Sequence, residues 1–110
     1  NWDDATGEFK RVLALRPDDA KVRQHLAEAL YLWGDALAQA NQLEHAMTRY
    51  RESAEVVDRG AELHTKIALM LARLGRFAEA RSELEMALKA DPAFVPAQRM
   101  LADVQKRQQN

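Results

Sequence analysis

Cysteine is absent from the 110-residue chain, which excludes disulfide scaffolds, thiolate metal sites and cysteine nucleophiles. A strong charge of either sign is also absent, because 16 Lys and Arg stand against 17 Asp and Glu and give a net charge of -1. We therefore expect neither a basic nucleic-acid module nor an acidic solvating tail. No apolar run approaches the roughly 18 residues of a bilayer span, and we expect no direct membrane binding.

Residues that break helices are scarce, with four Gly and three Pro in the whole chain. Between them lie stretches rich in Ala, Leu, Glu, Lys, Arg and Gln, the residues that lose least free energy on entering a helix. Val and Ile are few, and no segment alternates apolar and polar residues over the length of a strand. The sequence therefore predicts one small all-α domain.

Caps and breakers predict six helices joined by short links, so that successive helices lie antiparallel. Pro17 ends the first helix, Asp18 or Asp19 caps the second, and Gly75 is the expected left-handed stop of the fourth. The predicted helices run from about 2 to 15, from the cap at 18 or 19 to 40, from 43 to 57, from 61 to 73, from 77 to 90 and from 94 or 95 to 108.

A pattern of large and small residues recurs along the chain. In three segments a large residue precedes a small one by three positions, and a second large residue follows it by four. The spacing between copies is 41 residues and then 34 residues. The three copies are Trp2, Ala5 and Phe9; Leu43, Ala46 and Tyr50; and Phe77, Ala80 and Leu84.

This spacing resembles the tetratricopeptide repeat (TPR) family, bacterial-type TPR domains in particular, whose unit is a 34-residue helix–turn–helix. Pro17 and Pro92 stand where the family separates its units. Small residues stand where the family lets two helices approach closely, at Gly34, Ala46, Ala68 and Ala80. The resemblance implies a right-handed α-solenoid of antiparallel helical hairpins, with about six helices, an extended second helix and a C-terminal capping helix.

The repeat frame divides the single domain, residues 1–110, into four segments. They are the second helix of a truncated repeat at 1–17, a repeat with a seven-residue insertion at 18–60, a regular 34-residue repeat at 61–94 and the capping helix at 95–110. Because the chain begins with Asn1 rather than Met, we expect it to be a fragment of a longer protein.

Seven residues make close to two helical turns, so the insertion keeps the apolar face in phase and lengthens the second helix. The surplus lies either at 20–26 or at 35–41. We favour the first position because Gly34 then falls on the family's glycine. In the rival register Gly34 stops the helix.

Each hairpin of such an array buries its apolar face only against its neighbours. The predicted core consists of Phe9, Val12, Leu13, Leu26, Leu30, Trp33, Leu37, Leu43, Ala46, Tyr50, Ile67, Leu71, Phe77, Ala80, Leu84, Ala87, Leu88 and Leu101.

Residues that carry chemistry are not grouped. His25, His45 and His64 lie on three different predicted helices, without the close spacing of a helical zinc site, and we interpret them as structural or solvated. No glycine-rich phosphate loop and no nucleophile elbow is present. We predict no catalytic residue, no metal and no cofactor. A metal-binding or enzymatic role would require the three histidines to converge.

By resemblance to the family, the first helices of the units line a concave groove where an extended peptide or a partner helix docks. The groove candidates, carried over position by position, are Glu28, Tyr31, Leu32, Asp35, Glu62, Thr65, Lys66, Leu69, Arg73, Arg99 and Asp103. Lys66, Arg73 and Arg99 would hold acidic groups. Ordinary solvated helix surface is the alternative for each position. The family's carboxylate clamp is not expected, because Leu32 stands where that clamp has Asn.

We therefore predict a noncatalytic protein–protein interaction module that belongs to a larger protein and binds another protein or peptide, not nucleic acid. The alternative is self-assembly, as a homodimer or by helix exchange, through Trp2 and Phe9 on the uncapped N-terminal helix. The lack of cysteine suits the cytoplasm and the periplasm alike, so the sequence leaves the compartment open.

Overall fold

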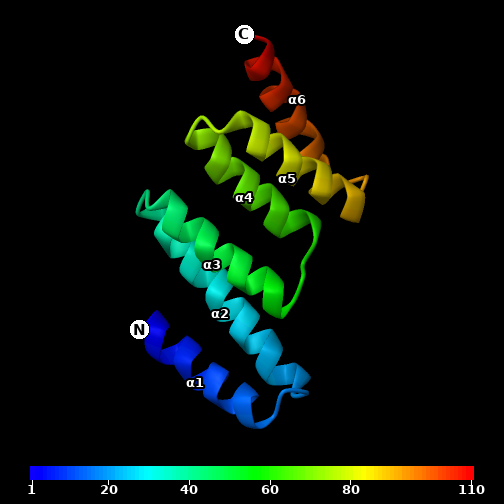
Figure 1. Cartoon of the computed structure of the whole chain (residues 1–110). Helices are drawn as coiled ribbons and strands as arrows, with labels where there is room; N and C mark the ends of the chain where they lie inside the picture. The colour runs from blue at the N-terminus through cyan, green and yellow to red at the C-terminus, as the bar shows by residue number, and fades with distance from the viewer. The chain divides into compact units, whose positions relative to one another are not determined.

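The computed structural model describes all 110 residues and contains six α-helices and no strand (Figure 1). The helices are α1 (Trp2–Leu15), α2 (Ala20–Gln39), α3 (Leu43–Val56), α4 (Ala61–Arg73), α5 (Phe77–Ala90) and α6 (Val95–Gln109). The predicted all-α fold is confirmed, and the helix bounds agree with the expected ones to within one or two residues. At 20 residues α2 is the longest, which confirms the extended second helix. No helix has the length and hydropathy of a membrane-spanning segment.

Local chemistry explains where the helices begin and end. The Oδ1 atom of Asp19 accepts a hydrogen bond from the backbone N–H of Val22 (3.2 Å), so Asp19 caps α2. Gly75 follows α4 with φ 77°, as expected. Asn41 takes the same left-handed role after α2 with φ 61°, a conformation that Asn tolerates better than most side chains. Asn41 and Gly75 are 34 residues apart, so the two helix ends repeat at the period of the sequence.

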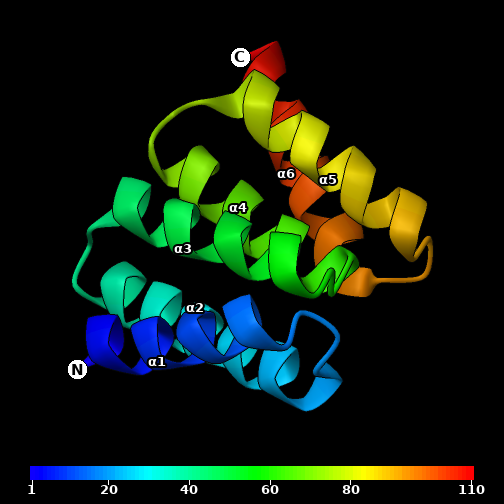
Figure 2. The same cartoon turned by 60° about the horizontal axis from the view of Figure 1, so that its bottom comes forward.

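The helices form two compact units, residues 1–58 and 59–110. In the first unit α2 packs on α3, and α1 packs on α2. In the second unit α4 packs on α5, and α6 contacts both. Figure 2 shows the helical hairpins within each unit, whose short links return the chain antiparallel to the preceding helix. These are the hairpins that the sequence predicts.

Helices α2 and α3 meet most closely at Gly34. A Cβ atom on Gly34 would lie 2.6 Å from Cε1 of Tyr50, so the ring occupies the space that a side chain would need. The Tyr50 hydroxyl donates a hydrogen bond to Oδ1 of Asp35 (2.5 Å), and its ring lies 5.9 Å from that of Tyr31. Gly34 is therefore a packing residue inside α2, and the register in which it stops the helix is wrong.

Polar contacts tie the helices of the first unit together. The fully buried Ser53 on α3 donates its Oγ hydrogen to the carbonyl of Ala27 on α2 (2.7 Å). The Arg49 guanidinium lies 4.3 Å from the ring centre of Trp33, a cation–π contact between α3 and α2. α1 is held more loosely. The hydroxyl of the buried Thr6 donates a hydrogen bond to the carbonyl of Trp2 (2.9 Å), so this bond stays within α1 and does not reach another helix.

The second unit also buries small residues on its paired helices. Ala68 on α4 and Ala80 on α5 are both fully buried. Nδ1 of His64 lies 2.8 Å from Oε2 of Glu83, so a largely buried polar pair joins α4 to α5. α6 adds Ala97 and Val104 to the buried set and leaves polar side chains on its outer face, as expected of a C-terminal cap.

Ten of the predicted core residues are buried and seven are half-buried. Val12 is the error, with 37% of its surface exposed. Val12 stays exposed because α1 packs mainly on α2, and Thr6 rather than Val12 occupies the covered face. The buried residues missing from the prediction include Ala27, Tyr31, Met47, Leu63, Met70, Ala97 and Val104.

Replacing Gly34 tests the close approach of α2 and α3. Gly34→Ala is expected to lower the free energy of unfolding by about 1–3 kcal/mol, because overpacking against the buried Tyr50 ring outweighs the better helix propensity of Ala. Urea denaturation followed by tryptophan fluorescence measures this change, since both tryptophans lie in the first unit. The matched control is Gly7→Ala on α1, where an added Cβ meets nothing within 4 Å. It should raise stability by about 0.5–1 kcal/mol. An equal gain from both variants would show that Gly34 is not a packing residue.

Leu84→Ala tests the core of the second unit. Leu84 is fully buried on α5, so the truncation should cost about 2–5 kcal/mol of unfolding free energy. Met86→Ala, on the same helix but 51% exposed, should change stability by less than about 0.5 kcal/mol. Urea unfolding followed by circular dichroism at the helical minimum compares the two. Similar losses for both variants would contradict this account of the core.

Candidate functional site

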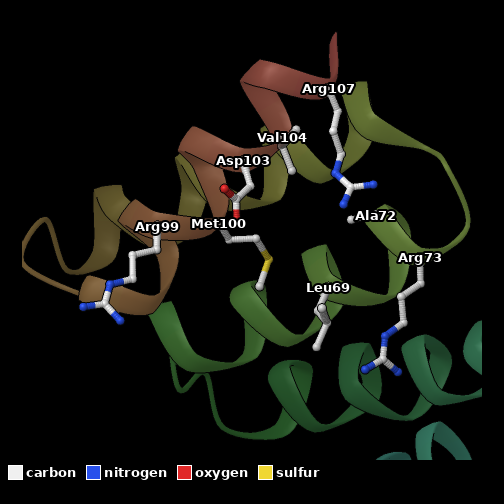
Figure 3. Close-up of a pocket in the computed structure, with 8 residues that line it drawn as sticks. All are labelled: Leu69, Ala72, Arg73, Arg99, Met100, Asp103, Val104 and Arg107. Carbon is white, nitrogen blue, oxygen red and sulfur yellow. The ribbon is translucent and has the colours of Figure 1, made fainter. Parts of the chain in front are cut away.

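A cleft of about 350 Å³ lies between α4 and α6 in the second unit (Figure 3). Three residues of α4 and five residues of α6 line it. They are Leu69, Ala72 and Arg73 on α4, and Arg99, Met100, Asp103, Val104 and Arg107 on α6.

Helical periodicity explains why these residues share the cleft. The α6 residues recur at intervals of three or four positions, which places them on one side of the helix. Residues 69, 72 and 73 do the same on α4. Because α6 rests mainly on α5 and only lightly on α4, the facing sides of α4 and α6 stay apart and leave the cleft.

The floor of the cleft is apolar. Val104 is buried, with 1% of its surface exposed, whereas Leu69 and Met100 are half-buried. In Figure 3 the Met100 side chain extends from α6 towards α4, and Leu69 comes from α4 on the other wall. An apolar floor of this size suits an apolar side chain brought by a partner.

Charged groups stand around this floor. Arg73, Arg99 and Arg107 contribute three guanidinium groups against the single carboxylate of Asp103, which gives the cleft a formal charge of +2. None of these four residues forms a salt bridge. The Arg107 guanidinium lies 5.9 Å from the centre of the Phe77 ring, so part of this side chain rests on an aromatic surface.

Four arginines outside the cleft are paired. Each lies within 4 Å of a carboxylate three or four residues away in the sequence. These pairs are Arg11 with Glu8, Arg49 with Glu52, Arg76 with Glu79, and Arg81 with Glu85. Arg16 and Arg23 form no salt bridge either, so the cleft is distinguished by the gathering of three such guanidinium groups around one cavity.

The structure brings together four of the residues predicted from the sequence to line a groove. Leu69, Arg73, Arg99 and Asp103 all line the cleft. The sequence reasoning missed Ala72, Met100, Val104 and Arg107. Their helical spacing from the predicted residues was the available signal, since Arg107 lies four positions after Asp103 and Met100 lies next to Arg99.

Other predicted groove residues serve contacts inside their own unit. Tyr31 is buried against the ring of Tyr50, and Asp35 accepts the hydroxyl hydrogen of Tyr50. Thr65 is also buried, and its hydroxyl donates to the carbonyl of Ala61 (2.6 Å). The remaining candidates lie at least partly at the surface, namely Glu28, Leu32, Glu62 and Lys66.

The residues predicted for self-association are only partly available. Trp2 has 38% of its surface exposed. Phe9 is half-buried, with its ring 5.8 Å from that of His25 on α2. Two further apolar side chains of α1 are exposed, Val12 at 37% and Leu15 at 85%.

The three histidines have separate surroundings. His25 lies against Phe9, His45 is exposed on α3, and His64 is paired with Glu83. No group of three or more His, Cys, Asp or Glu side chains in the structure is arranged to hold a metal ion.

Residues 61–104, which comprise α4, α5 and most of α6, match the family model described as tetratricopeptide repeat. Residues 61–104 therefore belong to the tetratricopeptide repeat family. It is also similar to sperm-associated antigen 1 of Mus musculus, with 32% identity over 92 residues. That alignment covers 84% of this chain and 10% of the relative, so the chain spans about a tenth of that protein's length.

The family match includes every residue of the cleft except Arg107. Tetratricopeptide repeats are in general protein-interaction modules and in general noncatalytic, so the TPR chain is assigned to this broad class.

Proposed function

We propose that this TPR chain holds a segment of a partner protein in the cleft between α4 and α6. The observation that carries the proposal is the apolar floor of Leu69, Met100 and Val104 within a rim of arginines that form no salt bridge in the chain. A partner side chain buried on such a floor, with polar contacts around it, is the arrangement in which a few residues supply most of the binding free energy.

The repeat division supports this proposal. We propose residues 61–94 as a regular repeat and residues 95–110 as its cap, so the cap forms the second wall of the cleft. In the first unit, residues 18–60 form the longer repeat and residues 1–17 the second helix of an incomplete one. The 34-residue spacing of Gly34 from Ala68, and of Asn41 from Gly75, supports this frame.

A peptide selection tests the proposal. Random dodecapeptides displayed on phage are panned on the immobilised chain, and each enriched peptide is then measured on two variants. Met100→Gln changes the cleft floor, whereas Met86→Gln makes the same change at an exposed site on α5. Binding should fall about tenfold or more on Met100→Gln, as expected for a central contact, and stay unchanged on Met86→Gln. Circular dichroism checks that both variants fold. If no enriched peptide depends on Met100, the proposed function is wrong.

A second candidate function is self-assembly through α1, and the exposed Trp2, Val12 and Leu15 favour it. These side chains lie along a helix that packs mainly on α2, so a second copy of the chain would cover them by forming a homodimer or by exchanging helices. Phe9 would contribute less than Trp2, because α2 already covers part of its ring.

Light scattering over a wide concentration range tests self-assembly. This candidate predicts a mass that doubles as the concentration rises, and a monomer for Trp2→Glu because a charge cannot be buried unpaired at the interface. Leu74→Glu, at a comparably exposed apolar residue of the second unit, is the matched control and should still form the dimer. A monomeric mass at every concentration would contradict self-assembly.

A further inference from the structure

On the basis of the proposed function, we infer that the occupant of the α4–α6 cleft is an extended acidic segment inside a partner protein. It carries one long apolar side chain for the floor and a side-chain carboxylate about two residues before it and about two residues after it.

The charge of the cleft selects an acidic partner. A buried or paired arginine has its hydrogen-bonding capacity used within the chain, but Arg73, Arg99 and Arg107 are exposed and form no salt bridge. A guanidinium binds a carboxylate through two parallel hydrogen bonds, which makes carboxylates its preferred partners in proteins. A basic segment would instead meet a local charge of +2.

The positions of the arginines set the spacing of the carboxylates. Arg99 and Arg107 are eight residues apart on α6, a distance of about 12 Å along the helix axis. Figure 3 shows them at opposite ends of the cleft, with Arg73 on the α4 wall. An extended chain advances about 3.3 Å per residue, so 12 Å corresponds to roughly four residues. Two carboxylates fit this span when one lies on each side of a central apolar residue.

The shape of the site favours an extended segment over a helix. A helix with its side chains is about 10–12 Å wide and turns only one ridge of side chains towards the surface on which it docks. An extended segment needs less width and directs alternate side chains the same way. We call the apolar residue that enters the floor the anchor. The residues two before it and two after it therefore lie on the same side of the backbone as the anchor.

Asp103 adds a restriction at the centre. It lies four positions from Arg99 and four from Arg107, between the two cationic ends of the α6 wall. Its carboxylate repels an acidic residue placed directly over the floor, while it accepts hydrogen bonds from backbone N–H groups of the segment. The anchor is thus apolar, and the acidic positions are displaced to its flanks.

Synthetic peptides test this inference by fluorescence anisotropy. The probe is fluorescein-labelled GSGESLSEGSG with a C-terminal amide, which has no terminal carboxylate and carries Glu two residues before and after Leu. Exchanging both Glu for Lys, or Leu for Ser, should weaken binding at least about tenfold, because each change removes a central contact. Raising the salt concentration should lower the affinity of the acidic peptide for the chain, because salt screens exposed charge pairs.

Variants of the chain identify the binding groups. Arg99→Gln and Arg107→Gln should each lower the affinity of the acidic peptide about two- to five-fold, as expected for exposed ion pairs. Arg81→Gln makes the same charge change on α5 outside the cleft and should leave the affinity unchanged. An affinity that does not respond to Arg99→Gln or Arg107→Gln would overturn the inference.

The phage selection separates failure of this inference from failure of the proposed function. Enriched peptides that depend on Met100 and carry flanking acidic residues support the inference. Peptides that depend on Met100 but are neutral or basic overturn it and leave the proposed function standing. The absence of any Met100-dependent peptide contradicts both the inference and the proposed function. Self-association that is lost in Arg99→Gln would assign the cleft to a second copy of the chain and would also overturn the inference.

Discussion

The close approach of paired helices at small side chains is the contact on which the rest of each unit depends. A helix of 13 to 20 residues carries one apolar stripe, and the helices next to it in the sequence cover that stripe. At Gly34 the missing side chain makes room for the Tyr50 ring, and this fixes α3 at one position along α2. The bonds of Ser53 to Ala27 and of Tyr50 to Asp35 follow from that register. In the second unit, where α4 packs on α5, the small residues Ala68 and Ala80 are likewise fully buried.

The cleft results from the same packing rule applied to an uneven number of helices. In the second unit α4 and α5 pack on one another, whereas α6 contacts α5 more than α4 and buries Ala97 and Val104. The side of α6 that includes Val104 faces α4 across the cleft. Because the third helix of the unit packs closely on only one of the other two, a cleft with an apolar floor and a charged rim is left beside it. The cleft is therefore a by-product of how the unit completes its core.

The sequence was sufficient for the helices because each is bounded by a cap or breaker that acts locally, such as Asp19 or Gly75. It was less informative wherever burial depends on which neighbour is present. Val12 occupies the repeat position that Ser53 and Ala87 occupy as buried residues, yet α1 packs mainly on α2 and leaves Val12 exposed. Thr65 was expected to line the groove because of the resemblance to the family, but its hydroxyl bonds a carbonyl of its own helix, and a threonine satisfied in this way is readily buried. Arg107 lies where the capping helix no longer follows the repeat pattern, so no equivalent position pointed to it.

The greater length of α2 has a consequence for how the molecule opens. With 20 residues, α2 is about 30 Å long, whereas the 14 residues of α3 reach about 21 Å. Leu26 is the first buried residue of α2, so its first two turns have α1 as their main cover, and α1 in turn has little cover of its own. Backbone amides exchange with solvent most readily where local opening disrupts few buried contacts. In α1 and the first turns of α2 they will exchange as one cooperative unit of low protection, ahead of the amides around Gly34, whose exposure requires α2 and α3 to separate.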